Sequence, residues 1–219
     1  MTDAHGHDHG AHDHGAHDHD HGAHDHGAHD HDTQAPGPLA DASVRRATVT
    51  DAPAVGLVQA EVWREAYATT VPPEVLATFQ PQSFAKAWRE SLANPPAGVH
   101  RLMVACAGDQ VVGFAAVGPT QDPDADSATA EVLALGVHPA ARRQGHGSRL
   151  LNACVDILRE AGATTMHAWL LHDHEATRAF LGASGLQPDG AYRDRIVSPA
   201  GDTAREVRLV ASLLDPDEP

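Results

Sequence analysis

The chain has 219 residues, with 30 acidic and 15 basic side chains, and its formal net charge at pH 7 is −15. A surface with this excess of negative charge repels a phosphate backbone, so we expect no nucleic-acid partner. Because the sequence has no run of about 18 consecutive apolar residues, as a membrane-spanning helix needs, we expect a cytoplasmic protein without membrane association.

The first 32 residues repeat the unit Gly-Ala-His-Asp-His and contain eight Asp but no Lys or Arg. They also lack Leu, Val, Ile and aromatic residues, so they cannot bury enough apolar surface to fold, and we predict a disordered segment. Flexible His-x-His pairs chelate divalent transition metals such as Zn or Ni through neutral imidazole. We therefore predict metal binding by twelve histidines, which are His5, His7, His9, His12, His14, His17, His19, His21, His24, His26, His29 and His31.

A solvated spacer or a purification tag is the competing interpretation of this segment. A tag is disfavoured because Asp, Gly and Ala interrupt the histidines. Residues 33–42 include Pro36, Gly37 and Pro38 and have the composition of a linker. The expected organisation is a tail with its linker over residues 1–42 and one folded domain over residues 43–215.

The expected domain begins with a strand near residues 44–49, and Thr50 or Asp51 can then cap a helix whose first turn accepts Pro53. A second helix is predicted over residues 83–93. Further along, the pattern predicts strands at 101–107, 110–117 and 129–137, a helix at 147–161, a strand at 165–171, a helix at 175–183, and strands at 186–193 and 205–213. This order predicts an α/β fold, called α+β by some conventions, in which about four helices flank a mixed sheet of about seven strands.

The most informative segment joins the strand at 129–137 to the helix at 147–161. The connecting turn contains Arg142, Arg143, Gly145 and Gly147, and the helix after it is amphipathic. The free amides and the dipole of a helix N-terminus favour an anion, and glycines let a phosphate approach the backbone closely. No Gly-Lys-Ser/Thr follows and no third glycine stands at dinucleotide-fold spacing, so the two commoner phosphate loops are excluded.

The stretch from Arg142 to Gly147 fits the pattern Arg/Gln-x-x-Gly-x-Gly/Ala and resembles the GCN5-related N-acetyltransferase family. Residues 44–48, 110–114, 180–181 and 185–186 are similar to further parts of the family's core. The resemblance implies that acetyl-coenzyme A is the co-substrate. Its pantetheine arm would pair with the strand at Leu135, Gly136 and Val137, and His174 would make a polar contact near that arm. Its pyrophosphate would sit on the loop formed by Arg142, Arg143, Gln144, Gly145, His146, Gly147 and Ser148.

The resemblance also implies acetyl transfer to a primary amine of a small molecule or a protein. Glu131 occupies the position where several family members hold their general base, and an ordinary exposed strand Glu is the competing interpretation. Family members often place an acidic Tyr where this chain has Leu181, which cannot donate a proton. Tyr192 or water could supply that proton, or the thiolate could leave without direct help.

Two other groups of polar side chains have simpler interpretations. Cys106 and Cys154 fall in apolar contexts typical of reduced core thiols, so we expect no disulfide. Asp122, Asp124 and Asp126 begin like a calcium loop, but the required glycine and the final acidic ligand are missing, and we reject that site.

His172 and His174 either share the metal of the tail or belong to a solvated loop, which we favour. Trp63, Tyr67 and Trp88 either line an acceptor pocket or pack in the core. The alternative function is a metal-binding or metal-sensing protein in which the folded domain is a non-catalytic acyl-coenzyme A-binding anchor. A homodimer is left open.

Overall fold

The computed structural model describes residues 42–214. The elements in chain order are β1 (Ala42–Arg46), α1 (Ala52–Ala66), α2 (Pro73–Leu76), α3 (Pro81–Ala93), β2 (Arg101–Ala107), β3 (Gln110–Pro119), β4 (Thr129–Val137), α4 (His146–Glu160), β5 (Thr165–Leu171), α5 (Glu175–Ala183), β6 (Gln187–Ile196) and β7 (Thr203–Ser212). Short 3₁₀ turns at Val49–Asp51 and Pro139–Ala141 precede α1 and α4. The predicted α/β fold with a seven-stranded mixed sheet is confirmed.

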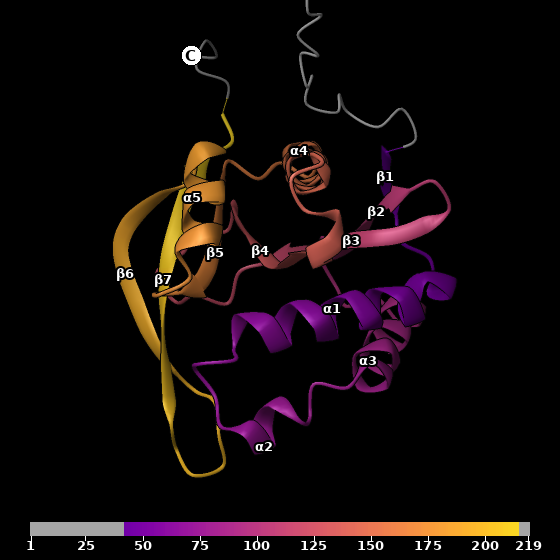
Figure 1. Cartoon of the computed structure of the whole chain (residues 1–219). Coiled ribbons are helices and arrows are strands. Elements are labelled where there is room, and N and C mark those ends of the chain that lie inside the picture. The colour runs from indigo at the N-terminus through magenta and orange to yellow at the C-terminus, as the bar shows by residue number, and fades with distance from the viewer. Residues whose placement is uncertain (1–41, 215–219) are drawn as a thin grey trace, which may run out of the picture. The chain divides into compact units, whose positions relative to one another are not determined.

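The strands form one sheet in the order β1-β2-β3-β4-β5-β7-β6. All neighbouring strands are antiparallel except β4 and β5, which are parallel. Since β7 inserts between β5 and β6, the last two strands form a long hairpin at the edge of the sheet (Figure 1). Among residues 42–214, no helix is long and apolar enough to cross a bilayer.

Strands β2 and β3 are buried on both faces, which is why their sequences read as nearly continuous apolar runs. Helix α4 covers one face, and α1 and α3 cover the other (Figure 1). On the α4 face, Met103 and Ala105 pack with Leu150 and Cys154. The opposite face forms a second core, whose buried members include Leu102, Val104, Phe114, Val55 and Val58. The alternation of side chains along each strand therefore supplies both cores at once.

The packing of α1 against α3 explains two features of the sequence. A Cβ atom on Gly56 would lie 2.5 Å from the carbonyl oxygen of Pro81, so only glycine permits this approach of the two helices. Trp88 donates its indole N–H to Gln59 Oε1 at 2.6 Å, and its ring lies 6.1 Å from that of Phe114. Of the two interpretations of Trp88, acceptor pocket or core, the structure supports packing in the core.

The observed boundaries differ from the predicted ones by one to three residues at several elements, among them β1, α3, β6 and β7. The first strand begins at Ala42 instead of residue 44, and α3 begins at Pro81 instead of residue 83. The sequence Pro72-Pro73, interpreted as a break, starts the single turn α2, because proline is compatible with the first position of a helix. The tail and its twelve histidines lie outside residues 42–214.

Candidate functional site

Strands β4 and β5 pair over only three positions, and then their ladder ends. The last pair is Glu131 with His167. Beyond it, residues 132–137 of β4 stay paired with β3, whereas β5 continues on β7. The edge of β4 that faces β5 therefore presents backbone N–H and C=O groups available to an extended ligand.

A β-bulge interrupts this edge at Leu133. The register with β3 shifts between the pairs Ala116–Ala134 and Val117–Val132, so Leu133 has no partner opposite it. The Leu133 side chain is 46% exposed, which is unusual for a large apolar residue in a central strand. A bulge redirects the local backbone, and here it does so two residues beyond Glu131, the last position at which β4 pairs with β5.

The loop after β4 leads into the N-terminus of α4. Gly145 is the N-cap, with φ of 80°, and Arg143 also has a left-handed φ of 64°. The first helical hydrogen bond is donated by the Arg149 amide to Gly145 O at 3.1 Å, so the amides of residues 146–148 precede the helical ladder. The first turn of α4 contains no acidic residue. These amides and the helix dipole form a site suited to a phosphate group.

Glycine at position 147 has a packing reason as well. A Cβ atom there would meet the Phe180 ring at 3.3 Å, so α5 packs closely against the start of α4. Leu181, next to Phe180, is only 3% exposed and belongs to the core under α4. The position where the family often holds an acidic Tyr is therefore filled by a buried apolar side chain.

The basic residues of the loop do not all point outward to a ligand. Arg142 donates two hydrogen bonds to Glu65 of α1, at 2.7 and 2.8 Å, and a third from Nε to Val137 O at 3.2 Å. The Arg142 hydrogen bonds lower the pKa of Glu65, and the charge of His174 contributes further. The guanidinium that we expected at the phosphates is thus already compensated by a carboxylate, whereas Arg143 is exposed.

The other predicted loop residues contribute in different ways. The His146 side chain is 1% exposed, with no hydrogen-bond partner for either ring nitrogen within residues 42–214, and burial lowers its pKa. His146 can therefore serve a ligand only through its backbone amide. Gln144 reaches back to Ala140 O at 3.4 Å, and Ser148 is exposed.

His174 is the N-cap residue of α5. Its Nδ1 lies 2.7 Å from Thr177 Oγ1. Through its charge it also acts on Glu65, so α1, the loop after β4 and the start of α5 approach one another at this point. The expected position of His174 beside the β4 edge is compatible with this arrangement.

Glu131 lies in a buried polar cluster. Its Oε2 is 3.4 Å from His167 Nε2, and its side chain is 13% exposed. Asp122 Oδ2 lies 3.5 Å from the same nitrogen, with its side chain 12% exposed. Glu131 is therefore not an ordinary exposed strand Glu, since it faces a histidine that is itself 2% exposed. Sequence reasoning missed His167, although a polar residue in the apolar strand β5 was an available signal.

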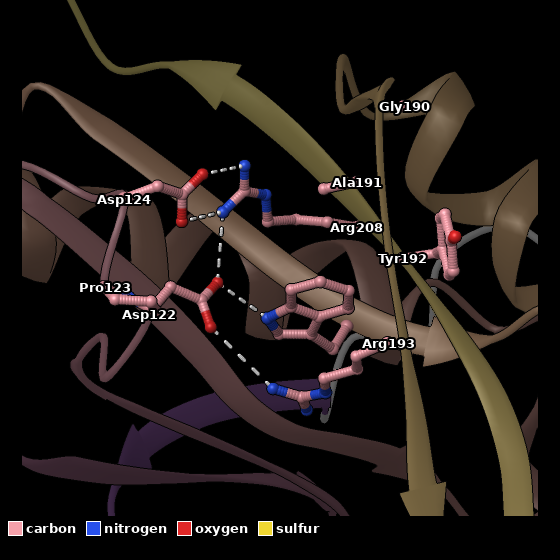
Figure 2. A pocket seen from close by; sticks show the side chains of 9 residues that line it. Asp122, Pro123, Asp124, Gly190, Ala191, Tyr192, Arg193 and Arg208 are labelled. Carbon is pink, nitrogen blue, oxygen red and sulfur yellow. Dashed lines mark hydrogen bonds and ion pairs between the residues drawn. The ribbon is translucent and has the colours of Figure 1, made fainter.

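Asp122 joins this cluster to a pocket of about 470 Å³ between the loop after β3 and strands β5 to β7. Asp122 accepts hydrogen bonds from Trp169 Nε1 at 2.9 Å and from Arg208 at 3.2 Å. Figure 2 shows Asp122 and Arg208 facing each other across this contact. Arg208 also pairs with Asp124, which lowers the pKa of that carboxyl group. Asp122 and Asp124, which begin like a calcium loop in the sequence, thus both form ion pairs with Arg208. Arg193 lies 4.2 Å above the Trp169 ring, which forms one wall of the pocket.

Tyr192 and Tyr67 differ in their exposure to solvent. Tyr192 is on the edge strand β6, 63% exposed, with the Arg205 guanidinium 4.8 Å above its ring. Tyr67 follows α1 and packs edge-on against Phe79. Burial raises the pKa of Tyr67, and the nearby charge of Glu206 raises it further. Tyr67 is the more enclosed of the two hydroxyl groups.

The described part of the chain offers no further metal site. Within residues 42–214, the His, Cys, Asp and Glu side chains form no group of three or more placed to hold a metal ion. Cys106 and Cys154 are both buried free thiols. The predicted metal site of the tail lies outside these residues and stays a prediction.

Comparison with known proteins gives consistent results. Residues 60–185 match the acetyltransferase (GNAT) family. A mycothiol acetyltransferase of Amycolatopsis mediterranei is 36% identical over 85 residues, which are 39% of this chain and 26% of that protein, so the match spans about a quarter of the relative's length. An N-acetyltransferase structure from Staphylococcus aureus Mu50 aligns over 80% of this chain and all of its own, with a TM-score of 0.61 and 20% identity. PaiA N-acetyltransferase of Thermoplasma acidophilum, in complex with coenzyme A, aligns over 75% and 97%, with a TM-score of 0.56 and 16% identity.

Proposed function

Because this chain belongs to the acetyltransferase (GNAT) family, we propose that it transfers an acetyl group from acetyl-coenzyme A to a primary amine of a small molecule or a protein. The observation that carries the proposal is the junction of the open β4 edge with the free amides at the start of α4. An extended acyl carrier with a diphosphate needs both an unpaired strand edge and an anion site, and here one connection of eight residues supplies them.

The residues of this junction fit the carrier. The amides of residues 146–148 point out of the helix end, and Gly145 and Gly147 leave the backbone accessible. Leu135, Gly136 and Val137 offer main-chain groups along the edge. Arg143 adds positive charge, whereas Arg142 adds it only after leaving Glu65. When bound, acetyl-coenzyme A supplies the thioester whose carbonyl carbon accepts the amine.

Glu131 removes the proton in the proposed reaction. A primary amine must be neutral to attack the carbonyl carbon, and it must lose a second proton as its C–N bond forms and the C–S bond breaks. Glu131 accepts that proton on its carboxylate and, because its side chain is only 13% exposed, it does so with little competing water. The pocket beside Asp122, at about 470 Å³, has the size of a small-molecule site, and Asp122 links it through His167 to the cluster that contains Glu131.

The departing thiolate needs a proton, and Tyr192 is the side chain assigned to it. Its exposure and its stacking with Arg205 leave its hydroxyl in contact with solvent. A Tyr192→Phe variant tests whether this hydroxyl delivers the proton to the thiolate. A rate within about threefold of the wild type would assign proton delivery to water, whereas a loss of about 100-fold would assign it to this hydroxyl.

The enzymatic proposal is tested by release of free thiol from acetyl-coenzyme A in the presence of a panel of amines. Glu131→Gln should lower kcat by about 100-fold or more while coenzyme A still binds. Glu160→Gln removes the same charge from the exposed end of α4 and is the matched control, with unchanged turnover expected. Wild-type protein that binds the cofactor but turns over no amine would contradict the proposal and favour the non-catalytic anchor.

We also propose that the twelve histidines of the tail bind a divalent transition metal such as Zn or Ni. The support is compositional: alternating His-Asp pairs combine neutral imidazole ligands with negative potential. Calorimetric titration of Zn or Ni into the full chain and into a chain lacking residues 1–32 tests it. Equal metal stoichiometry in the two proteins would show that the tail does not bind the metal. If metal changes the turnover of the full chain only, metal binding by the tail regulates acetyl transfer.

A further inference from the structure

His167 is a buried titratable group that the proposed acetyl transfer leaves without a role. Its side chain is 2% exposed, yet its Nε2 atom faces three oxygen atoms from two segments, the loop after β3 and strand β4. Thr120 Oγ1 lies at 2.9 Å, Glu131 Oε2 at 3.4 Å and Asp122 Oδ2 at 3.5 Å. One ring nitrogen therefore lies between two carboxylates and a hydroxyl group.

The surroundings of this nitrogen are strongly charged on one side. Asp122 accepts hydrogen bonds from Trp169 and Arg208 and lies 3.8 Å from Arg193, all at the wall of the pocket. The Trp169 ring also meets the His167 ring nearly edge-on, with centroids 6.5 Å apart. Asp122 thus connects the buried imidazole to a surface that solvent reaches.

One further charged group interacts electrostatically with the imidazole. Asp124, on the same loop as Asp122, feels the charge of His167, although its main partner is Arg208. On the β7 side, His167 is opposite Val210, which carries no charge. Glu131 and Asp122 are therefore the groups closest to the ring that would stabilise an added positive charge.

We infer that His167 relays the proton that Glu131 takes from the amine, passing it to Asp122 and the solvent of the pocket. This inference rests on the proposed acetyl transfer. The amine nitrogen loses a proton to the Glu131 carboxylate, and the resulting carboxylic O–H gives that proton to Nε2 of a neutral His167. The imidazolium then releases it through Asp122, so Glu131 and His167 both return to their starting states after each turnover.

The geometry supplies what each state of the imidazole needs. In the neutral state the relay requires the proton on Nδ1, and the Thr120 hydroxyl then donates to Nε2. In the charged state Nε2–H faces two carboxylates, and the same hydroxyl rotates to accept. A glutamine at this position could satisfy Thr120 equally well but could not carry a proton. A purely structural role therefore gives no reason for a titratable side chain between two carboxylates.

A His167→Gln variant tests the relay through pH profiles of kcat and KM. We expect kcat to fall by about 10- to 100-fold, KM for the amine to change by less than about threefold, and added imidazole buffer to restore part of the rate. The pH dependence of kcat/KM should also change, because the group that couples to Glu131 is lost. An unchanged melting temperature and unchanged coenzyme A affinity show that the variant is folded.

Two results would overturn the relay. A His167→Gln enzyme with the kcat and pH profile of the wild type refutes it alone. If the wild type itself shows no turnover, the proposed acetyl transfer is wrong, and the relay that depends on it is wrong as well.

Discussion

Replacing Gly145 with alanine tests the geometry of the anion loop most directly. Gly145 is the N-cap of α4 at φ of 80°, a conformation that costs a residue with a Cβ atom about 1 to 2 kcal/mol. The new Cβ would also lie 2.9 Å from Arg149 Nη1, which now donates a hydrogen bond to Gln144 O at 3.1 Å. Moving Arg149 away loses that bond, at a cost of about 0.5 to 1.5 kcal/mol. The total penalty is about 1.5 to 3.5 kcal/mol.

Gly162 provides a matched control at the other end of the same helix. It has φ of 83°, and a Cβ atom there would meet nothing within 4 Å. Gly162→Ala should therefore cost only the backbone strain of about 1 to 2 kcal/mol, without touching the loop. For a domain of this size, each kcal/mol lowers the melting temperature by about 2 to 4 °C.

The two variants should differ most in cofactor binding. The Gly145→Ala loop can relieve its strain by adopting another conformation, in which the amides of residues 146–148 no longer converge. If about 1.4 kcal/mol or more separates the two conformations, the competent fraction falls at least tenfold, and coenzyme A affinity falls with it. Calorimetric titration of coenzyme A should show this loss in Gly145→Ala and a change of less than about twofold in Gly162→Ala. Equal affinities in the two variants would refute the assignment of this loop.

Three further predictions concern the ion pairs and thiols. Glu65→Gln frees Arg142 for the phosphates, so coenzyme A should bind about two- to fivefold more tightly at low salt, and weaker binding would contradict the competition. Asp51→Asn should lower the unfolding free energy at pH 7 by about 1.5 to 3 kcal/mol in urea titrations, because Asp51 accepts bonds from Arg45 at 2.7 and 2.8 Å. Arg45 holds the pKa of Asp51 far below its usual range, so the stabilisation from this ion pair is present above pH of about 4 and declines on further acidification. If the difference in unfolding free energy between the wild type and Asp51→Asn instead grew in acid, this explanation would be wrong. Burial raises the pKa of Cys154 to about 12, so this thiol should react with a disulfide reagent at pH 8 only after unfolding.

The sequence by itself determined the order of the strands and longer helices, and it indicated the phosphate site that is proposed in the loop after β4. Both depend on neighbours within a few residues. Alternating and helical apolar patterns mark strands and helices, and the Gly145 and Gly147 positions identify a helix start where an anion can bind. The expected seven strands and the helices covering both faces follow from the same local patterns.

Only the tertiary structure decided which distant side chains meet. The order β5-β7-β6 and the early end of the β4–β5 ladder bring Glu131, His167 and Asp122 together from three segments. Arg142 forms hydrogen bonds with Glu65, which is 77 positions away in the chain. Sequence periodicity records which face of its own element a residue occupies, but contacts between elements depend on how the sheet is ordered and where its strands separate, and no local pattern encodes that.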